Sequence, residues 1–335
     1  MSRLKVALIG AGFIGSIHAA RWKMVEEAEI ITVVDILEER ARKLAGKYRI
    51  KSFYRDFREA LKNEDIDIVD VCTPTYTHKE VSLECIEQGK HVIVEKPIAL
   101  KLKDADEMIE ASRKNNVKFM VAHCLRFWPE YVVVKRIVDS GELGEPRVIR
   151  ACRQSPFPDW APWHNDLKMG GGVFIDMSIH DVDFLRWSIG DVVEVYARGG
   201  VLKRKKATAY DYVHTILRFS NGAIGYVEGS WIMPKSFPFT TYLEIVGTKG
   251  VLKVDNHTTA SVKVFTEDSA SDYTFIYKDA YYEELKQFAK SVINNKEPPI
   301  SGIEARKSLE VALAAVKSIK DGEPVKLPLK GDIFD

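Results

Sequence analysis

Residues 10–15 read Gly10-Ala11-Gly12-Phe13-Ile14-Gly15 and directly follow the apolar run Lys5–Ile9. An amphipathic pattern from Phe13 to Met24 comes next, so the hexapeptide joins a predicted strand to a predicted helix. In such a turn the first glycine permits the tight bend, the second lets a pyrophosphate approach the backbone, and the third lets helix and strand pack closely. The stretch therefore predicts the strand–turn–helix unit that opens a dinucleotide-binding sheet.

Outward from this turn, strand and helix patterns alternate from Leu4 to about Ala122. The strand patterns are Lys5–Ile9, Ile30–Val34, Ile66–Cys72, His91–Glu95 and Val117–Ala122, and the helix patterns are Phe13–Met24, Leu37–Lys47, Phe57–Lys62, His78–Gln88 and Asp104–Lys114. This rhythm predicts an α/β fold: an N-terminal Rossmann domain with a doubly wound parallel sheet and helices on both faces. The strands are almost continuously apolar, as burial on both faces requires.

After Pro129 the rhythm changes, and strands group together before helices close the chain. Helix patterns occur at Glu130–Asp139, Ser178–Ile189, Tyr281–Asn294 and Ile303–Lys320, and strand patterns at Glu194–Gly199, Tyr212–Phe219, Ala223–Met233, Tyr242–Val246, Val251–Val254, Ser261–Thr266 and Tyr273–Tyr277. This grouping predicts an α+β domain with a mostly antiparallel sheet. Because 335 residues exceed one ordinary core, we expect two domains, residues 1–122 and 123–335.

Composition narrows the class of protein further. Apolar residues make up 46% and the formal net charge is +1, which favours a globular chain without a nucleic-acid or membrane partner. The short basic run Lys203–Lys206 is interpreted as a solvated loop. The four cysteines are far apart and form no CxxC pair, which indicates buried thiols in a reducing compartment and no disulfide or zinc site. With no apolar run of about 18 residues, we expect a cytoplasmic protein.

The acidic residue after the second strand bears on the cofactor. Asp35 lies 20 residues after Gly15, where a carboxylate can bind both hydroxyls of a ribose. The same charge repels a 2′-phosphate, so NAD is favoured over NADP. Arg40 weakens this preference, because it is near enough in sequence to meet a phosphate. The alternative is an incidental glycine-rich turn in which Asp35 only caps a helix.

Two further motifs stand directly after predicted strands. They are Cys72-Thr73-Pro74-Thr75-Tyr76-Thr77-His78 and Glu95-Lys96-Pro97. In an open parallel sheet the loops beyond the carboxyl ends of strands line the ligand crevice. Lys96 would bring a positive charge to that crevice. Structural alternatives are a helix cap for Thr77 and a surface charge for Lys96.

A third motif lies in the second half of the chain, where residues 170–183 read GGGVFIDMSIHDVD. If the segment is helical from about Asp176, then Asp176, His180 and Asp183 project from one face. Two carboxylates around an imidazole form a plausible proton-handling unit. The alternatives are an exposed polar face with Asp176 as a cap, and a metal site, for which HxxD alone is thin support.

Together these motifs resemble the Gfo/Idh/MocA oxidoreductase family over nearly the whole chain. The resemblance implies a Rossmann domain followed by a domain built on a large open sheet, commonly assembled into dimers or tetramers through that sheet. It also implies that Lys96, Asp176 and His180 match the family's catalytic lysine, aspartate and histidine. One departure concerns Cys124, which stands where members similar to inositol dehydrogenase often have asparagine, and this puts inositol itself in doubt.

We therefore predict an NAD-dependent dehydrogenase that exchanges a hydride with a hydroxyl-bearing carbon of a sugar, nucleotide sugar or inositol-like polyol. His180 takes the hydroxyl proton, Lys96 stabilises the reacting oxygen and Asp176 orients the substrate or His180. Residues expected to bind the cofactor are Gly10, Gly12, Phe13, Ile14, Gly15, Asp35, Arg40, Thr73, Pro74, Thr75, His78, Glu95, Lys96 and Pro97. Residues expected to bind substrate are Lys96, Arg126, Trp160, Trp163, His164, Asp176 and His180.

Some alternatives stay open. The aromatic residues of 157–164 either stack on sugar faces or pack a domain interface. The chain as a whole is either the dehydrogenase described, a reductase of a non-sugar substrate, or a non-catalytic dinucleotide sensor or scaffold. The intact Lys96, Asp176 and His180 argue against the sensor, which has no need of a proton-transfer set.

Overall fold

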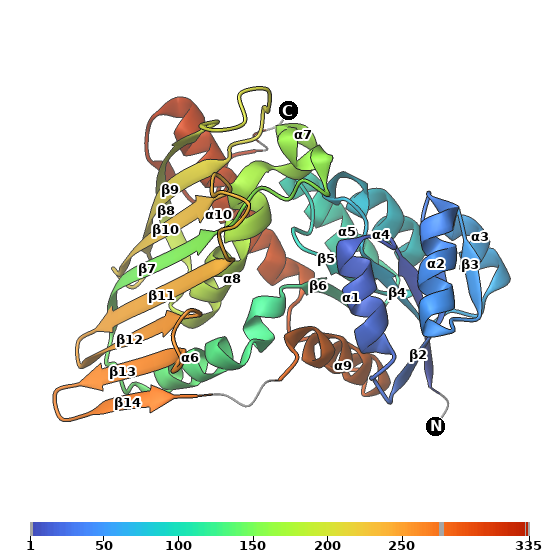
Figure 1. The fold of residues 1–335 in the computed structure, drawn as a ribbon, viewed down its shortest axis with the longest axis horizontal. Helices are drawn as coiled ribbons and strands as arrows, with labels where there is room; N and C mark the ends of the chain where they lie inside the picture. Colours follow the sequence, from blue (N-terminus) through green and yellow to red (C-terminus); the bar gives the residue numbers. More distant parts are fainter. Residues whose placement is uncertain (1–2, 275–277, 332, 334–335) are drawn as a thin grey trace. The chain divides into compact units, whose positions relative to one another are not determined.

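The computed structural model describes residues 3–274, 278–331 and 333. The chain divides into two compact units, which are described separately (Figure 1). Unit 1 comprises Met1–Cys124 and Asp279–Arg306, and unit 2 comprises Leu125–Lys278 and Lys307–Asp335. The predicted boundary at 122/123 is close to the first crossing at Cys124, but a single boundary does not accommodate the return of residues 279–306 to unit 1.

Unit 1 is built on a six-stranded parallel sheet in the order β3-β2-β1-β4-β5-β6. Its strands are β1 Leu4–Ile9, β2 Ala28–Val34, β3 Ser52–Tyr54, β4 Ile68–Val71, β5 His91–Glu95 and β6 Phe119–Ala122. This is the doubly wound order of dinucleotide-binding sheets, which confirms the predicted fold class. The sequence did not predict β3, because three residues are too few to show a period.

Helices complete unit 1 between and after these strands. They are α1 Phe13–Trp22, α2 Glu38–Tyr48, α3 Phe57–Asn63, α4 His78–Glu87, α5 Leu102–Lys114 and α9 Ala280–Ile293, with a short 3₁₀ turn η1 at Thr75–Thr77. The last of these packs on α1: Arg21 pairs with Asp279 at 2.7 Å, and the rings of His18 and Tyr281 lie 6.0 Å apart. These contacts explain why residues 279–306 belong to the first unit.

Unit 2 is built on a nine-stranded sheet in the order β14-β13-β12-β11-β7-β10-β9-β8-β15. Its strands are β7 Pro146–Gln154, β8 Val192–Gly200, β9 Tyr212–Phe219, β10 Ile224–Ser230, β11 Thr240–Gly247, β12 Gly250–Asp255, β13 Val262–Thr266, β14 Ala270–Tyr273 and β15 Val325–Lys326. All neighbours are antiparallel except β7 and β10, as the sequence predicted. The predicted strand at Tyr273–Tyr277 lies partly outside the described residues.

The central strand β7 was missed by the sequence analysis. Its inward positions are Ile149, Ala151 and Arg153, all at most 2% exposed. Arg153 is buried because its guanidinium donates two hydrogen bonds, of 2.9 and 2.8 Å, to the carboxylate of Asp181. A buried cation breaks the apolar alternation that identifies a half-buried strand.

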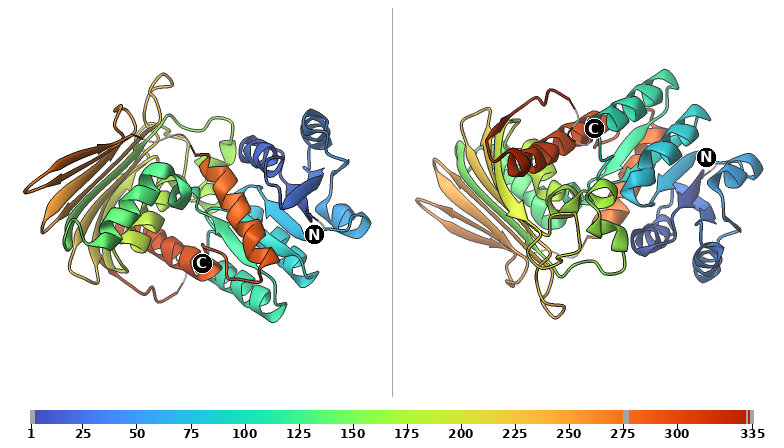
Figure 2. Two further views of the ribbon diagram at one scale, coloured as in Figure 1. Left: turned by 90° about the horizontal axis from the view of Figure 1, so that it is seen from below. Right: turned by 90° about the horizontal axis from the view of Figure 1, so that it is seen from above.

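One face of the nine-stranded sheet is covered by helices and the other is open (Figures 1 and 2). The covering helices are α6 Pro129–Ser140, α8 Ile179–Ser188 and the unit-2 part of α10 Gly302–Asp321, and the short elements nearby are η2 Cys124–Phe127, η3 Pro162–Asn165, α7 Leu167–Gly170 and the π-helical turn η4 Phe174–Ser178. On the open face, Val148, Ile216, Ile224 and Phe265 are 38–52% exposed. Among the described residues, no helix combines the length and apolar character that crossing a membrane requires.

Candidate active site

The glycine turn of unit 1 has the backbone that its motif predicts. Gly10 has φ +103°, and a Cβ there would lie 2.4 Å from the carbonyl oxygen of Cys72. A Cβ at Gly15 would lie 1.9 Å from the carbonyl oxygen of Gly10. At Gly12 a Cβ would meet no atom within 4 Å. The first and third glycines are therefore required by packing, whereas the second leaves open space where a pyrophosphate can approach the backbone.

Asp35 directs its carboxylate at this turn. It follows β2, and its Oδ2 accepts a hydrogen bond of 2.8 Å from the amide of Ala11 while its Oδ1 accepts one from the amide of Leu37. The acidic group thus lies at the edge of the loop, as binding of a ribose diol requires. Phe13 is 64% exposed beside the turn, and Arg40 is exposed in the first turn of α2. Phe13, Asp35 and Arg40 stay predicted cofactor-binding residues.

The loops after β4 and β5 are tied together by His78. Its Nδ1 lies 3.0 Å from the carbonyl oxygen of Pro97, and its Nε2 lies 2.9 Å from that of Thr73. The side chain is 1% exposed, and burial lowers its pKa. His78 therefore holds two loops of the predicted cofactor site together through backbone contacts, and its imidazole is engaged with the protein itself.

Lys96 immediately follows β5 at the same edge of the sheet. Glu95 before it is buried, and its Oε2 accepts a hydrogen bond of 3.1 Å from the backbone amide of Lys96. Lys96 itself is half-buried. The buried carboxylate therefore fixes the backbone from which the predicted catalytic lysine projects.

A buried ionic network behind this edge escaped the sequence analysis. His18 Nδ1 lies 2.9 Å from Asp70 Oδ2, and His18 Nε2 lies 3.2 Å from Glu95 Oε1. Trp22 donates to Asp70 at 2.7 Å, and Cys72 Sγ lies 3.3 Å from His18 Nδ1. All five residues are at most 7% exposed. The available signal was an acidic residue, Asp70, inside the apolar run Ile66–Cys72.

The electrostatics of this network favour a charged imidazole. Burial opposes a charge on His18, but the adjacent Asp70 carboxylate outweighs it and holds the pKa of His18 well above its ordinary value. Burial also raises the pKa of the Cys72 thiol, which is therefore neutral. His18, Asp70 and Cys72 offer three atoms within 4.8 Å of one another, a spacing that a metal ion can use. Their hydrogen-bonding distances and the Trp22 contact fit an ion-paired network equally well.

In unit 2, the segment with Asp176 and His180 is not a regular helix throughout. Residues Phe174–Ser178 form a π-helical turn, and α8 begins at Ile179. Asp176 and His180 are half-buried, whereas Asp183 is fully buried. Asp183 pairs with Arg126 in the core, whereas the π-helical turn affects only the spacing between Asp176 and His180. A shared proton-handling role for Asp176 and His180 stays a prediction.

Two buried ion pairs fix this segment in place. Asp183 accepts two hydrogen bonds of 2.6 and 2.7 Å from Arg126, and Asp181 pairs in the same bidentate manner with Arg153. Ser308 adds a 3.0 Å hydrogen bond to Asp183. Arg126 is 6% exposed, so this geometry favours a structural role for Arg126 over the predicted substrate contact.

The aromatic residues around 157–164 separate into exposed and buried members. Trp160 is 68% exposed, whereas His164 is 6% exposed, with its ring 5.2 Å from that of Trp231. Trp163 is half-buried, and its ring centroid lies 3.7 Å from that of His164. Trp160 and Trp163 are thus accessible to a ligand, while the buried His164 packs against Trp163.

A doubly wound sheet with this glycine turn and an acidic residue after its second strand defines an NAD-binding oxidoreductase domain. Residues 4–123 match the "Oxidoreductase family, NAD-binding Rossmann fold", and residues 131–253 match the "GFO/IDH/MocA C-terminal domain". The chain belongs to the Gfo/Idh/MocA oxidoreductase family, as its motifs predicted.

The chain is also similar over nearly its whole length to named dehydrogenases. The chain is 34% identical to myo-inositol 2-dehydrogenase of Thermotoga maritima, over 97% of this chain and 98% of that protein. It is 33% identical to scyllo-inositol 2-dehydrogenase (NAD(+)) of Bacillus subtilis, over 98% and 97%. A crystal structure of a probable dehydrogenase from Thermotoga maritima aligns with a TM-score of 0.84 at 34% identity, over 97% and 99%. The chain is thus an NAD-dependent dehydrogenase acting on CH–OH groups, as predicted.

Proposed function

We propose that this chain oxidises a secondary alcohol of a cyclic polyol or sugar, with Lys96, Asp176 and His180 acting on the substrate. The observation that carries the proposal is the fixed backbone of Lys96 at the carboxyl end of β5, in the same parallel sheet as the strand β1 that leads into the glycine turn. Two of the relatives are named inositol 2-dehydrogenases, which supports a cyclic polyol as the substrate. Bound NAD supplies the acceptor for a hydride.

The protein side chains manage the proton and the developing charge. His180 accepts the hydroxyl proton at a ring nitrogen, because an unprotonated imidazole nitrogen acts as a general base. The Lys96 ammonium donates a hydrogen bond to the same oxygen and stabilises its negative charge. Asp176 orients the substrate or His180. The proposal requires Lys96 and His180 to act on one hydroxyl group.

Binding of the dinucleotide is assigned to the carboxyl edge of the unit-1 sheet. The amides of the turn and of the first turn of α1 present N–H groups to the phosphates. Asp35 accepts hydrogen bonds from the ribose hydroxyls and repels a 2′-phosphate. The remaining residues assigned to the cofactor are Phe13, Ile14, Arg40, Thr73, Pro74, Thr75, Glu95 and Pro97, and Trp160 and Trp163 are assigned to the substrate.

The test compares His180→Asn and Lys96→Met with the wild-type chain and with His257→Asn, which changes an exposed histidine after β12. With a panel of inositols and sugars, kcat should fall about 10²–10⁴-fold in the first two variants and stay near wild type in the control. Absorbance of reduced nicotinamide measures kcat, and fluorescence titration should show nearly unchanged NAD affinity in His180→Asn and in the control.

Two outcomes would contradict the proposal. Retention of most turnover by either active-site variant would remove the assigned role. A wild-type chain that binds NAD but reduces it with no polyol or sugar would point to a sensor instead.

The preference for NAD over NADP is tested in the same titration. NADP should bind more weakly than NAD, and the reverse order would contradict the interpretation of Asp35.

We also propose that the chain forms a homodimer or homotetramer through the open face of its nine-stranded sheet. Ile216 of β9 and Ile224 of β10 are 43% and 52% exposed on that face, and exposed apolar patches of this kind mark interfaces. Light scattering should give two or four times the chain mass. The double variant Ile216→Asp/Ile224→Asp should lower it, whereas Ile293→Asp on α9 should not. A wild-type monomer would overturn the proposal. A cytoplasmic location stays a prediction.

A further inference from the structure

A basic loop of unit 2 is held in a defined conformation by a buried carboxylate. The loop joins β8 to β9, and Asp211 at its end is 1% exposed. The Asp211 side chain accepts hydrogen bonds of 2.7, 2.9 and 3.0 Å from the backbone amides of Leu202, Lys203 and Arg204. The run Lys203-Arg204-Lys205-Lys206 is therefore presented by a fixed backbone rather than by an unanchored solvated loop.

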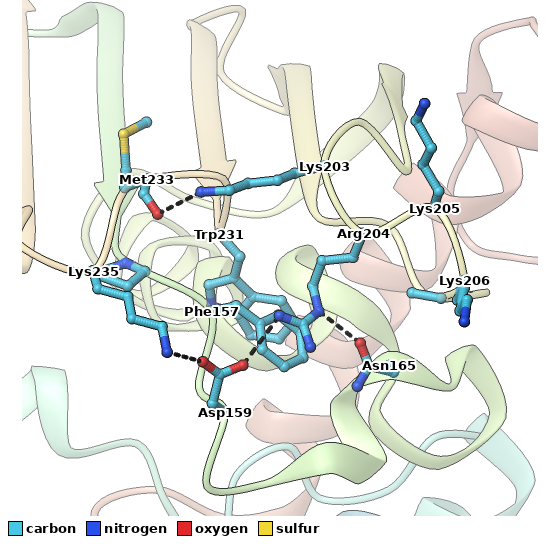
Figure 3. Close-up of a pocket in the computed structure, with 12 residues that line it drawn as sticks. Phe157, Asp159, Asn165, Lys203, Arg204, Lys205, Lys206, Trp231, Met233 and Lys235 are labelled. Atoms are coloured by element: carbon cyan, nitrogen blue, oxygen red, sulfur yellow. Dashed lines mark hydrogen bonds and ion pairs between the residues drawn. The ribbon is translucent and has the colours of Figure 1, made fainter.

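This loop forms one wall of a pocket of about 600 Å³ (Figure 3). That volume is within the range of small-molecule sites, roughly 300–1,000 Å³. The pocket is lined by Pro156, Phe157, Asp159, Asn165, Lys203, Arg204, Lys205, Lys206, Ala207, Trp231, Met233 and Lys235. All of these residues belong to unit 2.

The central cation of the pocket is held on an aromatic surface. The Arg204 guanidinium lies 3.6 Å from the ring centroid of Phe157, and Phe157 packs edge-to-face on Trp231 at 5.4 Å. Arg204 also donates to Asn165 at 2.8 Å and to Asp159 at 3.1 Å, as Figure 3 shows. A guanidinium fixed in this way loses little entropy when it binds a further anion.

The charge of the pocket is strongly one-sided. The residues that line the pocket include five cations, Lys203, Arg204, Lys205, Lys206 and Lys235, and one carboxylate, Asp159, which leaves four positive charges in excess. Asp159 is shared between Arg204 and Lys235, the latter at 3.3 Å. The whole chain carries only +1, so this excess is a local feature of the pocket. Neutral polyols give no reason to gather such a charge, whereas an anionic group does.

The basic loop is hydrogen-bonded to the segment that leads to the proposed acid–base residues. The carbonyl oxygen of Asn165 accepts hydrogen bonds from the amides of Thr208 and Ala209 on the basic loop. The next residue along that loop, Tyr210, accepts a 2.9 Å hydrogen bond from the amide of Val173, and Val173 leads directly into the π-helical turn with Asp176. A ligand group in the pocket would therefore be held by the same framework as the reacting end.

We propose that this pocket binds the phosphate or carboxylate group of an anionic sugar substrate, with Arg204 and the lysines of the loop as its partners and Phe157 and Trp231 as an apolar floor. The inference rests on the proposed function and narrows its substrate class from neutral polyols to sugars that carry a negative group. Phosphate and carboxylate share the chemistry that bidentate arginine and lysine recognise.

The test is calorimetric titration of the full chain saturated with NAD, so that the dinucleotide site is not available to phosphates. The probes are glucose 6-phosphate, glucuronate, UDP-glucose and neutral glucose. At least one anionic probe should bind about tenfold or more tightly than glucose, and its affinity should fall steeply with salt. The probe that binds most tightly identifies the anionic group.

The variant Lys205→Gln/Lys206→Gln should weaken that probe about tenfold or more, roughly the effect of one lost charge-assisted hydrogen bond. Arg204→Gln should do the same. The control Lys320→Gln/Lys326→Gln removes two exposed charges from another part of unit 2 and should leave the affinity unchanged. Equal binding of all four probes, or an anion preference that survives in both pocket variants, would overturn the inference.

Failure of the pocket and failure of the proposed function are separable, because calorimetry needs no turnover. A chain that binds anionic sugars through the loop but never reduces NAD contradicts the proposed function alone. A chain that oxidises neutral polyols while the pocket variants change no affinity contradicts the pocket alone.

Discussion

His18 is fully buried between two carboxylates, at 2.9 Å from Asp70 and 3.2 Å from Glu95. Removing one partner of a buried ion pair leaves an uncompensated charge, which costs about 3–5 kcal/mol. We therefore expect His18→Gln to lower the free energy of unfolding by about that amount, as measured by denaturant titration. In the double variant with Asp70→Asn the loss should be smaller than the sum of the single losses. Additivity within about 0.5 kcal/mol would show that the pair is not coupled.

The pH dependence of this contribution follows from the raised pKa of His18. The folded chain holds the proton more tightly than the unfolded chain, so the stabilisation is complete below about pH 6.5, the ordinary histidine pKa. It is lost as the pH rises through the higher folded value. The groups that face the imidazole are Asp70, Cys72, Glu95 and Tyr281. The difference in unfolding free energy between wild type and His18→Gln should therefore shrink with rising pH.

At the scale of elements, two helical glycines differ in whether a side chain can be accommodated. A Cβ at Gly15 would lie 1.9 Å from a backbone oxygen, whereas a Cβ at Gly46 in α2 would meet nothing within 4 Å. We expect Gly15→Ala to disrupt NAD binding, because the turn must open. Gly46→Ala should raise the unfolding free energy by about 0.5–1 kcal/mol and leave NAD binding unchanged. NAD titration and thermal unfolding of both variants measure these effects. Equal NAD affinity and equal stability of the two variants would contradict the packing argument.

The elements also show what the sequence can and cannot predict. The strand His91–Glu95 and the helices around Phe13, Phe57 and His78 follow from apolar periodicity and turn residues, and the structure has them within a few residues. Strand β7 and the π-helical turn were not predicted. Strand β7 carries the buried Arg153, which pairs with Asp181 of α8, and Arg126 pairs with Asp183 of the same helix. These partners are distant in sequence and leave no periodic signal.

At the scale of the whole chain, unit 1 is completed only by residues 279–306, which follow the first segment of unit 2, Leu125–Lys278. The Arg21–Asp279 ion pair and the packing of α9 on α1 join the two segments. We expect residues 1–124 alone to give a weak thermal transition and poor NAD binding. Residues 1–124 joined through a Gly/Ser linker to 279–306 should fold cooperatively and bind NAD. Calorimetry and NAD titration compare the two fragments, and equal stability would show that α9 is dispensable.

In the candidate site, too, some residues could be predicted from the sequence and others could not. The glycine turn, Asp35 and the motif Glu95-Lys96-Pro97 were recognised because each stands at the end of a strand. His18 was not, because its importance arises only when α1, β4 and β5 bring it to Asp70 and Glu95. The basic loop was interpreted as merely solvated, because a sequence does not reveal that Asp211 anchors it or that Phe157 lies beneath Arg204.

The return of the chain to unit 1 at Asp279 has a consequence for synthesis on the ribosome. From Cys124 to Asp279 is 155 residues, which at roughly 5–20 residues per second takes about 8–30 s. For that interval the nascent nucleotide-binding unit has no α9 to cover α1, while the first segment of unit 2, Leu125–Lys278, emerges. The unit that begins first therefore waits for residues 279–306, and the face of α1 that α9 covers is open to chaperones throughout the delay.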